Sequence, residues 1–376
     1  MILIGADIVP SSSNEKLFFS GNLDLLMGVG LKNLFNESDY NILNLEVPLV
    51  DFSSPIEKSG PVLRANTKCI NAIKRMGVDL FTLANNHIMD QGVIGLESTI
   101  DLLKRNNICF VGAGRNIEES RKSFLVEVNG KRIGFYACAE HEFSIADDFN
   151  PGANPFDPLE SLDHVFELRK KCDFLIVLYH GGKEHYRYPS PVLQRVCRKI
   201  IQKGANLVVC QHSHCIGCEE KYDGKTIVYG QGNFLFDDDH GPYSNTSLLI
   251  KINDDFSIEY LPLIKVEGGV RLADGKNAEN ILQQFNSRSE QIKQDAFIFE
   301  EYKKFAMQSF DSYMLACMGY GHRFFLKILN RLTAYRLTKL LVGSYKKKEL
   351  LYLRGVIQCE AHRELWLEGL KNKLEK

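Results

Sequence analysis

The stretch SPVLQRVCRKIIQKGANLVVCQHSH, residues 190–214, places a helix, a buried strand and two histidines in direct succession. Ser190 can cap a helix, Pro191 suits the first turn, and Gly204 fits the left-handed position after its end. The run ANLVVC then predicts a buried strand, and a helix followed by such a strand is typical of a parallel sheet. Three apolar residues at helical spacing predict the buried stripe of the helix: Val192, Val196 and Ile200.

Five strand-like apolar runs along the chain lead directly into residue types that bind metal ions. Parallel strands bring their carboxyl ends to one edge of a sheet, where residues remote in sequence can meet. Each residue alone also fits a cap, a turn or a solvent-facing position, but the repetition favours one metal centre. The candidate ligands are Asp7, Glu46, Asn86, His180, His212 and His214.

These side chains indicate a particular chemistry. Imidazole, carboxylate and amide oxygen suit Zn, Mn or Fe, and a carboxylate can bridge two ions. Two ions roughly 3.5–4 Å apart can clamp a phosphoryl group and acidify a water, so we expect two divalent ions as cofactors. His87 could protonate a leaving oxygen with Asp90 orienting it, or it could only cap its loop. His212 and His214 alternate, which predicts both imidazoles on one side of an extended segment.

Composition excludes some classes of protein. The chain has 376 residues and a formal net charge of -1, which gives no global attraction to nucleic acid or membrane. We find no secretory signal and no run of ~20 apolar residues, and we therefore expect a cytoplasmic protein with reduced thiols. The pair Cys215 and Cys218 fits a zinc knuckle, a redox pair or, by default, buried thiols.

The chain divides into two regions of different character. Residues 1–270 alternate helix and strand, with hairpins expected at Asn129-Gly130 and Asp254-Asp255. This pattern predicts two packed sheets with helices outside. Residues 271–376 carry helical patterns only, with turn residues near 268–275 as the boundary, and we expect a helical C-terminal region there.

The helical region contains a basic stretch. Between Gly319 and Lys348 there is no acidic residue. An apolar face of Phe325, Ile328, Leu329 and Leu332 adjoins a ridge of Arg323, Lys327 and Arg331. Such helices can contact an anionic membrane surface at the inner face, a synthase complex or an anionic polymer, or they can simply pack with a solvated basic face. The eight positive charges are Arg323, Lys327, Arg331, Arg336, Lys339, Lys346, Lys347 and Lys348.

Five ordered motifs resemble one known family. LANNHIMDQGVIGLESTIDLLKRNNICFVGAG is similar to the central signature of the CapA family of capsule and poly-gamma-glutamate biosynthesis proteins, which are related to calcineurin-like metallophosphoesterases. NLEVPL, YHGGKEHY, GANLVVCQHSH and IVYGQGNFLFD resemble it in the same order, over roughly residues 1–265. The resemblance implies a four-layer α/β/β/α sandwich, followed here by a C-terminal helical extension.

The resemblance also implies roles for single residues. Asp7, Glu46 and His214 would hold one metal, with Glu46 bridging. The second site would be completed by Asn86, His180 and His212, and His87 would be the acid. Asn233 would lie near substrate, and Glu184 matches an acidic position of uncertain role. Two positions depart from the wider superfamily: Val9 stands where Asp-x-His would place a histidine, and Gln211 where a glycine often precedes the histidine pair.

Three functions are compatible with these residues. We expect a metal-dependent, phosphoesterase-like hydrolase that acts on an anionic polymer or a phosphorylated small molecule in the synthesis of a capsule or other cell-surface polymer. A non-hydrolytic subunit of a synthesis or export complex is the alternative that the valine at position 9 favours. Amide hydrolysis of an anionic polymer fits the same metal centre. Nucleic acid is not an expected partner, because no recognised binding fold is present.

Overall fold

The computed structural model describes residues 1–236, 243–317, 324–333 and 335–374, which form two compact units, Met1–Phe299 and Glu300–Lys376. The division therefore lies later than the expected boundary near residue 270. Helix α9 (Gly275–Gln291) belongs to the first unit because Ile281 and Phe285 pack against Ile216 and Leu248.

The first sheet has the strand order β16-β15-β14-β1-β2-β3-β4, and β13 also pairs with β1. Strands β1 to β4 and β13 run parallel, whereas β14, β15 and β16 are added antiparallel. The bounds are β1 Ile2–Val9, β2 Tyr40–Leu45, β3 Leu80–Thr82, β4 Cys109–Val111, β13 Asn233–Phe236, β14 Thr246–Ile252, β15 Ile258–Val266 and β16 Gly269–Leu272.

The second sheet has the order β11-β12-β10-β9-β7-β6, in which β7, β9, β10 and β12 are parallel. A short ladder joins β5 (Ala113–Gly114) to β8 (Gly152–Ala153). The bounds are β6 Phe124–Val128, β7 Lys131–Ala139, β9 Phe174–His180, β10 Leu207–Gln211, β11 Glu219–Tyr222 and β12 Lys225–Tyr229.

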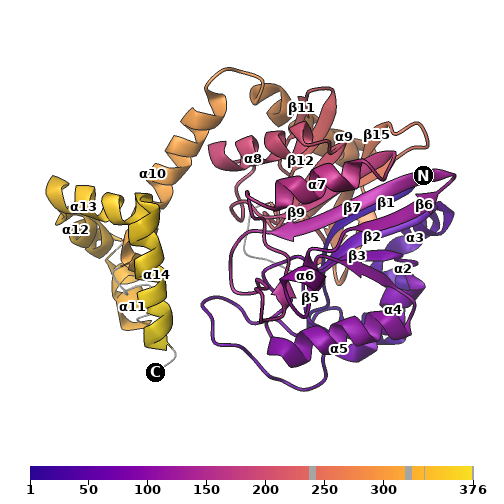
Figure 1. Ribbon diagram of the computed structural model, residues 1–376, viewed down its shortest axis with the longest axis horizontal. Helices are drawn as coiled ribbons and strands as arrows, with labels where there is room; N and C mark the ends of the chain where they lie inside the picture. Colours follow the sequence, from indigo (N-terminus) through magenta and orange to yellow (C-terminus); the bar gives the residue numbers. More distant parts are fainter. Residues whose placement is uncertain (237–242, 318–323, 334, 375–376) are drawn as a thin grey trace. The chain divides into compact units, whose positions relative to one another are not determined.

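Helices cover the outer faces of both sheets, with α4 and α5 on one side and α7 and α8 on the other (Figure 1). The helices before α9 are α1 Glu15–Ser20, α2 Leu23–Leu26, α3 Gly28–Glu37, α4 Ile70–Arg75 with the 3-10 turn η1 Thr67–Cys69 before it, α5 Gly92–Arg105, α6 Ile117–Ser120, α7 Ser161–Arg169 and α8 Pro191–Gln202.

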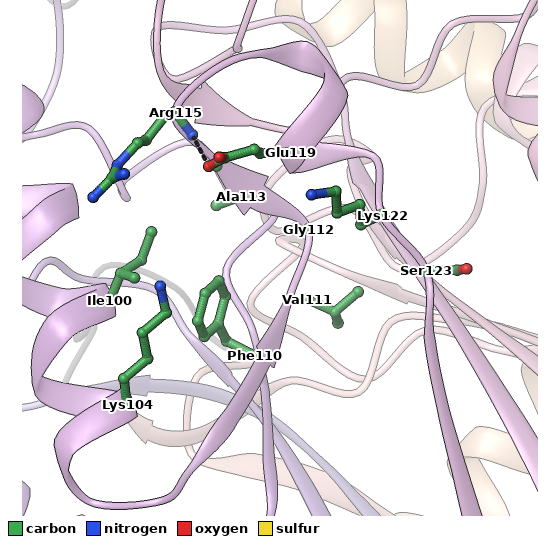
Figure 2. Close-up of a pocket in the computed structure, with 11 residues that line it drawn as sticks. Ile100, Lys104, Phe110, Val111, Gly112, Ala113, Arg115, Glu119, Lys122 and Ser123 are labelled. Atoms are coloured by element: carbon green, nitrogen blue, oxygen red, sulfur yellow. Dashed lines mark hydrogen bonds between the residues drawn. The ribbon is translucent and has the colours of Figure 1, made fainter.

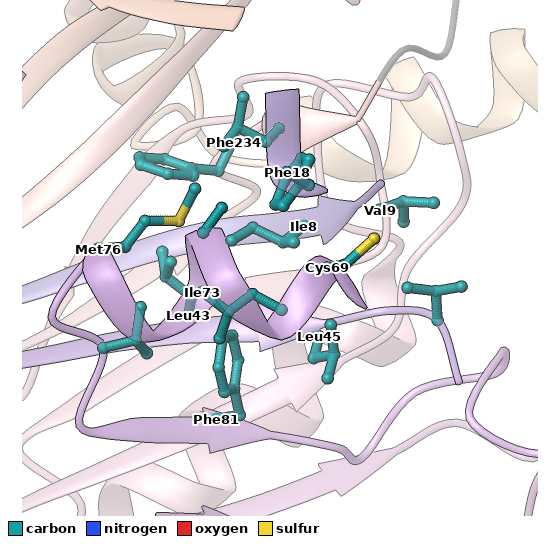
Figure 3. Close-up of a cluster of buried hydrophobic side chains, with 14 of the residues drawn as sticks. Ile8, Val9, Phe18, Leu43, Leu45, Cys69, Ile73, Met76, Phe81 and Phe234 are labelled. Atoms are coloured by element: carbon teal, nitrogen blue, oxygen red, sulfur yellow. The ribbon is translucent and has the colours of Figure 1, made fainter. Parts of the chain in front are cut away.

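Three apolar clusters separate four layers. In the first, Ile8, Leu43 and Phe81 of the first sheet pack against Phe18 and Ile73 of helices α1 and α4 (Figure 3). The second fills the space between the sheets, where residues of β1 and β2 face those of β7 and β9. The third joins the second sheet to α7 and α8. The predicted α/β/β/α sandwich is therefore confirmed, and it buries parallel strands on both faces.

The structure confirms the predicted hairpin turns and the predicted start of helix α8. The hairpin turns join β6 to β7 at Asn129-Gly130 and β14 to β15 at the Asp254-Asp255 turn, as expected. In α8, Ser190 caps the helix by accepting a hydrogen bond from the backbone of Leu193, and Pro191 is its first residue. The predicted stripe is wrong at Val192, which is 58% exposed. The buried side is rotated toward the sheet and consists of Leu193, Gln194, Cys197, Ile200 and Ile201.

The second unit is helical where it is described, as expected. Ile328, Leu329 and Leu332 of the predicted apolar face are exposed, whereas Arg323 and the side chains of Phe325 and Lys327 lie outside the described part. No described helix combines the length and apolar character needed to cross a membrane. The bounds are α10 Phe297–Cys317, which begins in the first unit, α11 Phe324–Leu332, α12 Arg336–Gly343, α13 Lys347–Gln358 and α14 Glu360–Leu374.

Candidate metal centre

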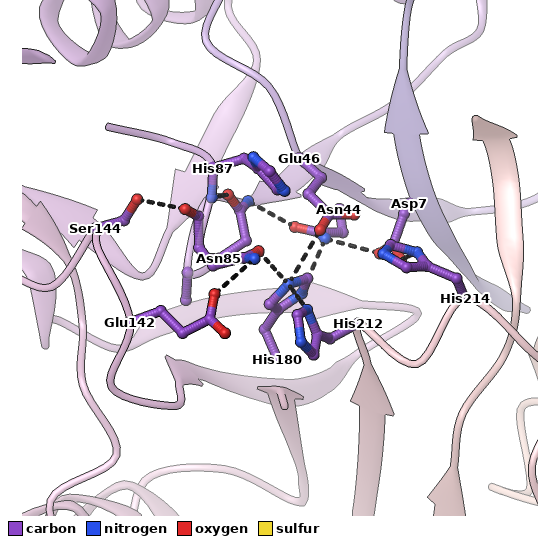
Figure 4. Close-up of polar contacts among 12 residues, drawn as sticks. Asp7, Asn44, Glu46, Asn85, His87, Glu142, Ser144, His180, His212 and His214 are labelled. Carbon is purple, nitrogen blue, oxygen red and sulfur yellow. Dashed lines mark hydrogen bonds and ion pairs between the residues drawn. The ribbon is translucent and has the colours of Figure 1, made fainter. Parts of the chain in front are cut away.

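The predicted ligands lie at the carboxyl ends of five parallel strands and meet at one edge of the two sheets (Figure 4). Asp7 is near the end of β1, Glu46 directly follows β2, and Asn86 lies in the loop after β3. His180 is the last residue of β9, and the histidine pair follows β10. All six side chains are buried, Asp7 and Glu46 completely.

Glu46 is shared by two groups of metal-type ligands. One group is Glu46, His180 and His212, and the other is Asp7, Glu46 and His214. Within each group the ligand atoms lie within 4.8 Å of one another. These groups contain five of the six ligands that the family resemblance implied, and Glu46, which that resemblance made the bridging residue, belongs to both groups.

His180 is the meeting point of the first group. Its Nε2 lies 3.0 Å from Oδ1 of Asn86 and 3.3 Å from Oε1 of Glu46. Nδ1 of His212 lies 3.2 Å from the same nitrogen. The amide of Asn86 is oriented because its Nδ2 donates to Oε2 of Glu142 at 2.8 Å, which leaves Oδ1 facing the imidazole. Four potential ligand atoms thus surround one small volume.

The second group is held by neighbouring amides. Nδ1 of His214 lies 3.5 Å from Oδ2 of Asp7 and donates to Oδ1 of Asn233 at 2.8 Å. Asn44 donates to Oδ1 of Asp7 at 2.8 Å. Asn233, predicted to lie near substrate, is therefore in contact with a candidate ligand and orients its ring, as partners behind metal ligands commonly do.

The buried carboxylates lack compensating donors. Among the described atoms, neither oxygen of Glu46 nor Oδ2 of Asp7 accepts a hydrogen bond. Burial, and after it the charge of Asp7, raises the pKa of Glu46 to about 8. Burial alone would also raise the pKa of Asp7, but the close contact with His214 at 3.5 Å and the charge of His180 lower it.

The imidazoles respond to the same surroundings. Burial lowers the pKa of His180 to about 4 and that of His212 well below its ordinary value. Burial works against the charged form of His214 too, yet Glu46 and Asp7 raise its pKa to about 10. The neutral imidazoles of His180 and His212 and the unsatisfied carboxyl oxygens of Glu46 and Asp7 converge in a buried space, an arrangement that fits a divalent cation.

The histidine pair does not have the expected backbone. β10 ends at Gln211, and His212 and His214 have φ of 85° and 51°, so this segment is not extended. The prediction assumed an extended segment in which alternate side chains share one side, and that assumption is wrong. The bend sends His212 to one ligand group and His214 to the other, and such left-handed residues are concentrated at functional sites.

His87 and Asp90 form a separate pair beside the ligands. Nδ1 of His87 donates to Oδ2 of Asp90 at 2.6 Å, which leaves Nε2 as the nitrogen available for proton transfer. Asp90 also forms an ion pair with Lys58 and accepts from the backbone of Leu63 at 2.6 Å. Asp90 therefore orients the ring as predicted, within a buried network that includes an unpredicted lysine.

Other predicted positions are placed as follows. Glu184 is partly buried and lies 3.3 Å from Nζ of Lys183. Burial alone would raise its pKa, but the charges of His212 and Lys183 lower it, so Glu184 lies near this edge of the sheets. Val9 belongs to the same apolar cluster as Phe18 (Figure 3), and its side chain offers no ligand. Cys215 and Cys218 are buried free thiols, the default interpretation.

Sequence analysis missed several residues that position the site. Asn44 stands two residues before Glu46, and Asn85 directly precedes a candidate ligand, so the motifs themselves contained a signal. Asn85 donates to Asn44 at 3.1 Å and to the backbone oxygen of Leu45 at 2.9 Å. Lys58 and Glu142 come from irregular segments, where no pattern indicated them.

Gln211 joins the two sheets behind the site. Its Nε2 donates to the backbone oxygen of Gly5 in β1 at 3.1 Å, and Gln231 donates to that of Ile4 at 2.9 Å. The residue that departs from the usual glycine thus fixes the two ligand-bearing sheet edges against each other.

A cavity of about 280 Å³ beside β4 contains none of the predicted site residues among the residues that line it (Figure 2). Two of its three cationic side chains have contacts within the protein: Arg115 lies 3.6 Å from Glu97, and Lys104 lies over the ring of Phe110. The predicted metal ligands therefore lie at the sheet edge and not in this cavity.

Two capsule biosynthesis proteins are similar in sequence to this chain. The chain is 31% identical over 209 residues to the PGA biosynthesis protein CapA of Bacillus subtilis, covering 54% of this chain and 55% of that protein. It is 27% identical over 288 residues to the capsule biosynthesis protein CapA of Bacillus anthracis, covering 69% and 70%. The first match thus spans little more than half the length of that relative.

A solved structure and a family profile complete the comparison. A crystal structure of a phosphatase from Mycoplasma pneumoniae aligns with a TM-score of 0.44 and 14% identity, covering 79% of this chain and 97% of that chain. The profile of the bacterial capsule synthesis protein family PGA_cap matches residues 26–238. This match covers more than half of the 376 residues, and the protein therefore belongs to the bacterial capsule synthesis protein family PGA_cap.

Proposed function

We propose that this protein is a metal-dependent hydrolase of the phosphoesterase type that acts in the synthesis of a capsule or another cell-surface polymer. The observation that carries the proposal is Glu46, a buried carboxylate shared by two ligand groups without a hydrogen-bond donor in the described chain. A bridging carboxylate between two cations is the arrangement that relieves such a group.

The proposed cofactors are two divalent ions, with Mn, Zn and Fe as candidates from the ligand types. Asp7, Glu46 and His214 would hold one ion, and Glu46, His180, His212 and Asn86 the other. Ions bound there would supply Lewis-acid polarisation of a phosphoryl or acyl oxygen and would acidify a water.

The remaining chemistry belongs to the protein. His87 holds its ring by the 2.6 Å hydrogen bond to Asp90, and its Nε2 is the atom that would give a proton to the leaving oxygen. Lys58 pairs with Asp90 from the side and fixes the carboxylate. Asn233 keeps His214 in place through the 2.8 Å contact. Because the whole network is buried, its geometry is set before substrate arrives.

Val9 supports a second candidate function. A valine in the apolar core leaves the Asp7 group without the histidine that related phosphoesterases place two residues later. A weaker first site would suit a non-hydrolytic subunit that uses the pocket to bind an acidic chain within a synthesis or export complex. In that case the protein would bind the polymer without turnover under any divalent ion.

The basic helices of the second unit are proposed as a contact with an anionic membrane surface. Arg331, Arg336 and Lys339 are exposed, as are the three lysines 346–348. Near anionic lipid each such side chain contributes about 1 kcal/mol. The exposed Leu332 could insert among the headgroups.

Turnover assays test the hydrolase proposal. The protein, loaded with Mn, Zn or Fe, is assayed on p-nitrophenyl phosphate, bis-p-nitrophenyl phosphate and poly-gamma-glutamate, with product analysis to separate phosphoester from amide cleavage. We expect Asn86→Ala and His212→Ala to lower kcat by at least a hundredfold. His164→Ala, on helix α7, is the matched control. Unchanged turnover in both site variants would contradict the proposal.

A further inference from the structure

Two arginines form a cationic site next to the candidate metal centre. Arg187 lies in the loop after β9 and Arg288 on α9, and both line a surface cavity of about 470 Å³. Arg187 donates through Nε to the backbone oxygen of Ile216 at 3.1 Å. Arg288 donates through Nε to that of Gly217 at 2.7 Å. Both guanidinium groups are thus fixed to one short segment of backbone.

That segment connects the cavity to the metal centre. Gly217 follows His214 by three residues, a stretch of chain that spans at most about 11 Å even when fully extended. Arg187 belongs to the loop that follows His180, and in the same loop the backbone N–H of His185 donates to the backbone oxygen of Ser213 at 2.8 Å. A ligand of a few repeating units could therefore contact the arginines and the metal centre together.

No carboxylate in the described part of the chain balances the charge of these arginines. Arg288 is only 6% exposed, and its Nη2 has no hydrogen-bond partner among the described atoms. No described carboxylate forms an ion pair with either guanidinium, in contrast to Arg198, which pairs with Glu220. Burial, and then the charge of Arg187, lowers the pKa of Arg288 to about 10. A buried and unpaired guanidinium is costly, which favours an external anion as its partner.

The rest of the lining suits an oxyanion. The guanidinium carbon of Arg187 lies 4.4 Å from the centre of the Tyr243 ring, a cation–π contact that helps to hold this group beside the cavity. Ser287 and Gln284 of α9 add neutral polar groups to the same cavity. Arginine pairs of this kind recognise carboxylate and phosphate groups through paired N–H donors.

We propose that Arg187 and Arg288 bind a carboxylate or phosphate group of the substrate at a position remote from the bond that is cleaved. This subsite rests on the proposed function, because it would select acidic polymers or multiply phosphorylated molecules as substrates. It would hold one anionic group while another part of the same molecule occupies the metal centre.

Calorimetric binding to the metal-free full-length protein tests the subsite without reference to turnover. The probes are glutarate for a carboxylate source and inorganic phosphate for a phosphate source. We expect at least one to bind, and the one that binds identifies the source. Arg187→Gln should weaken binding at least about tenfold, because charge-assisted hydrogen bonds are lost. Arg195→Gln, an exposed arginine on α8, removes the same charge as a matched control and should bind as the natural protein does.

Further variants separate the subsite from the metal centre and from folding. His212→Ala removes a metal-centre imidazole and should keep anion binding, whereas Arg288→Gln should lose it. Arg187→Gln carries the test if Arg288→Gln does not fold, since Arg187 is partly exposed. The proposal is overturned if neither probe binds, if Arg187→Gln binds as tightly as the natural protein, or if His212→Ala abolishes binding.

Discussion

Oε1 of Glu46 lies 3.3 Å from Nε2 of His180, yet within the described chain neither oxygen of this carboxylate accepts a hydrogen bond. The contact is close enough for charge attraction and lacks the geometry of a hydrogen bond. A buried carboxylate in such a position is unfavourable to the fold without a cation. The stability of the protein should therefore depend on metal ions.

Removal of metal should lower the melting temperature. A ligand that binds only the folded state stabilises by about 2.7 kcal/mol at a free concentration of about 100 times its Kd. We expect Mn or Zn to raise Tm in a thermal scan and EDTA to reverse the shift. Mg, a harder ion that prefers oxygen ligands, should be less effective. A Tm that is indifferent to all three ions would contradict this prediction.

The stabilisation of the fold by bound metal ions should increase as pH rises. The pKa of Glu46 is raised from 4.5 to about 8 and that of His214 from 6.5 to about 10, so the folded state holds both protons more tightly than the unfolded state. The stability that each group contributes is fully present below its pKa in the unfolded state. It is lost as pH rises through its pKa in the folded state. The lowered pKa values of Asp7 and His180 change the stability of the fold only below about pH 6.5.

Between pH 6.5 and 10 the metal-free protein should therefore lose stability as pH rises. Metal ions displace the same protons, so their stabilising effect should increase over this window. Urea denaturation at several pH values, with and without Mn, measures both trends. Glu46→Gln should flatten the metal-free trend between pH 6.5 and 8. An equal slope in that variant would mean that another group titrates.

The buried pair of Lys58 and Asp90 should matter to stability as well as to turnover. Both side chains are nearly inaccessible, at 2% and 0% exposure. Asp90→Ala should cost roughly 3–5 kcal/mol because it leaves a buried ammonium without its partner. Asp24→Ala breaks the exposed pair with Lys32 and should change stability by less than about 1 kcal/mol. Chemical denaturation of both variants compares them directly, and similar small losses would exclude the proposed role of Lys58.

Neutralising the lysines at residues 346–348 should weaken membrane contact. Their change to glutamine should reduce partitioning onto vesicles rich in anionic lipid by about 1 kcal/mol for each lysine at low salt. Lys304→Gln is the control, because Glu301 already pairs with that lysine at 2.5 Å. Vesicle co-sedimentation measures the difference. Equal partitioning of both variants would argue that these helices have another partner.

Much of the site could be predicted because it depends on strand ends. A buried parallel strand can be recognised in the sequence as an apolar run, and the residue that follows it must lie at the carboxyl edge of the sheet. This is why Glu46 and His180 were identified from sequence and are found together. The bend at His212 and His214 could not be predicted, since their positive φ values arise from the surrounding loop and not from a turn residue.

Residues that reach the site through tertiary packing cannot be predicted from a sequence motif or from apolar periodicity. Lys58 lies in an irregular segment and reaches Asp90 only because that segment folds over the loop after β3. Arg288 is carried to Gly217 by the packing of Phe285 against the strands, from a helix that the sequence assigned to another region. The exposed Val192 was misplaced because an apolar periodicity does not fix which side of a helix faces the sheet.

An anomalous-difference map from crystals soaked with Mn or Zn tests the central claim most directly. We predict two peaks about 3.5–4 Å apart, with Glu46 between them, Asp7 and His214 at one peak and His180 and His212 at the other. No peak among these six side chains, or a peak bound only elsewhere on the protein, would contradict the account.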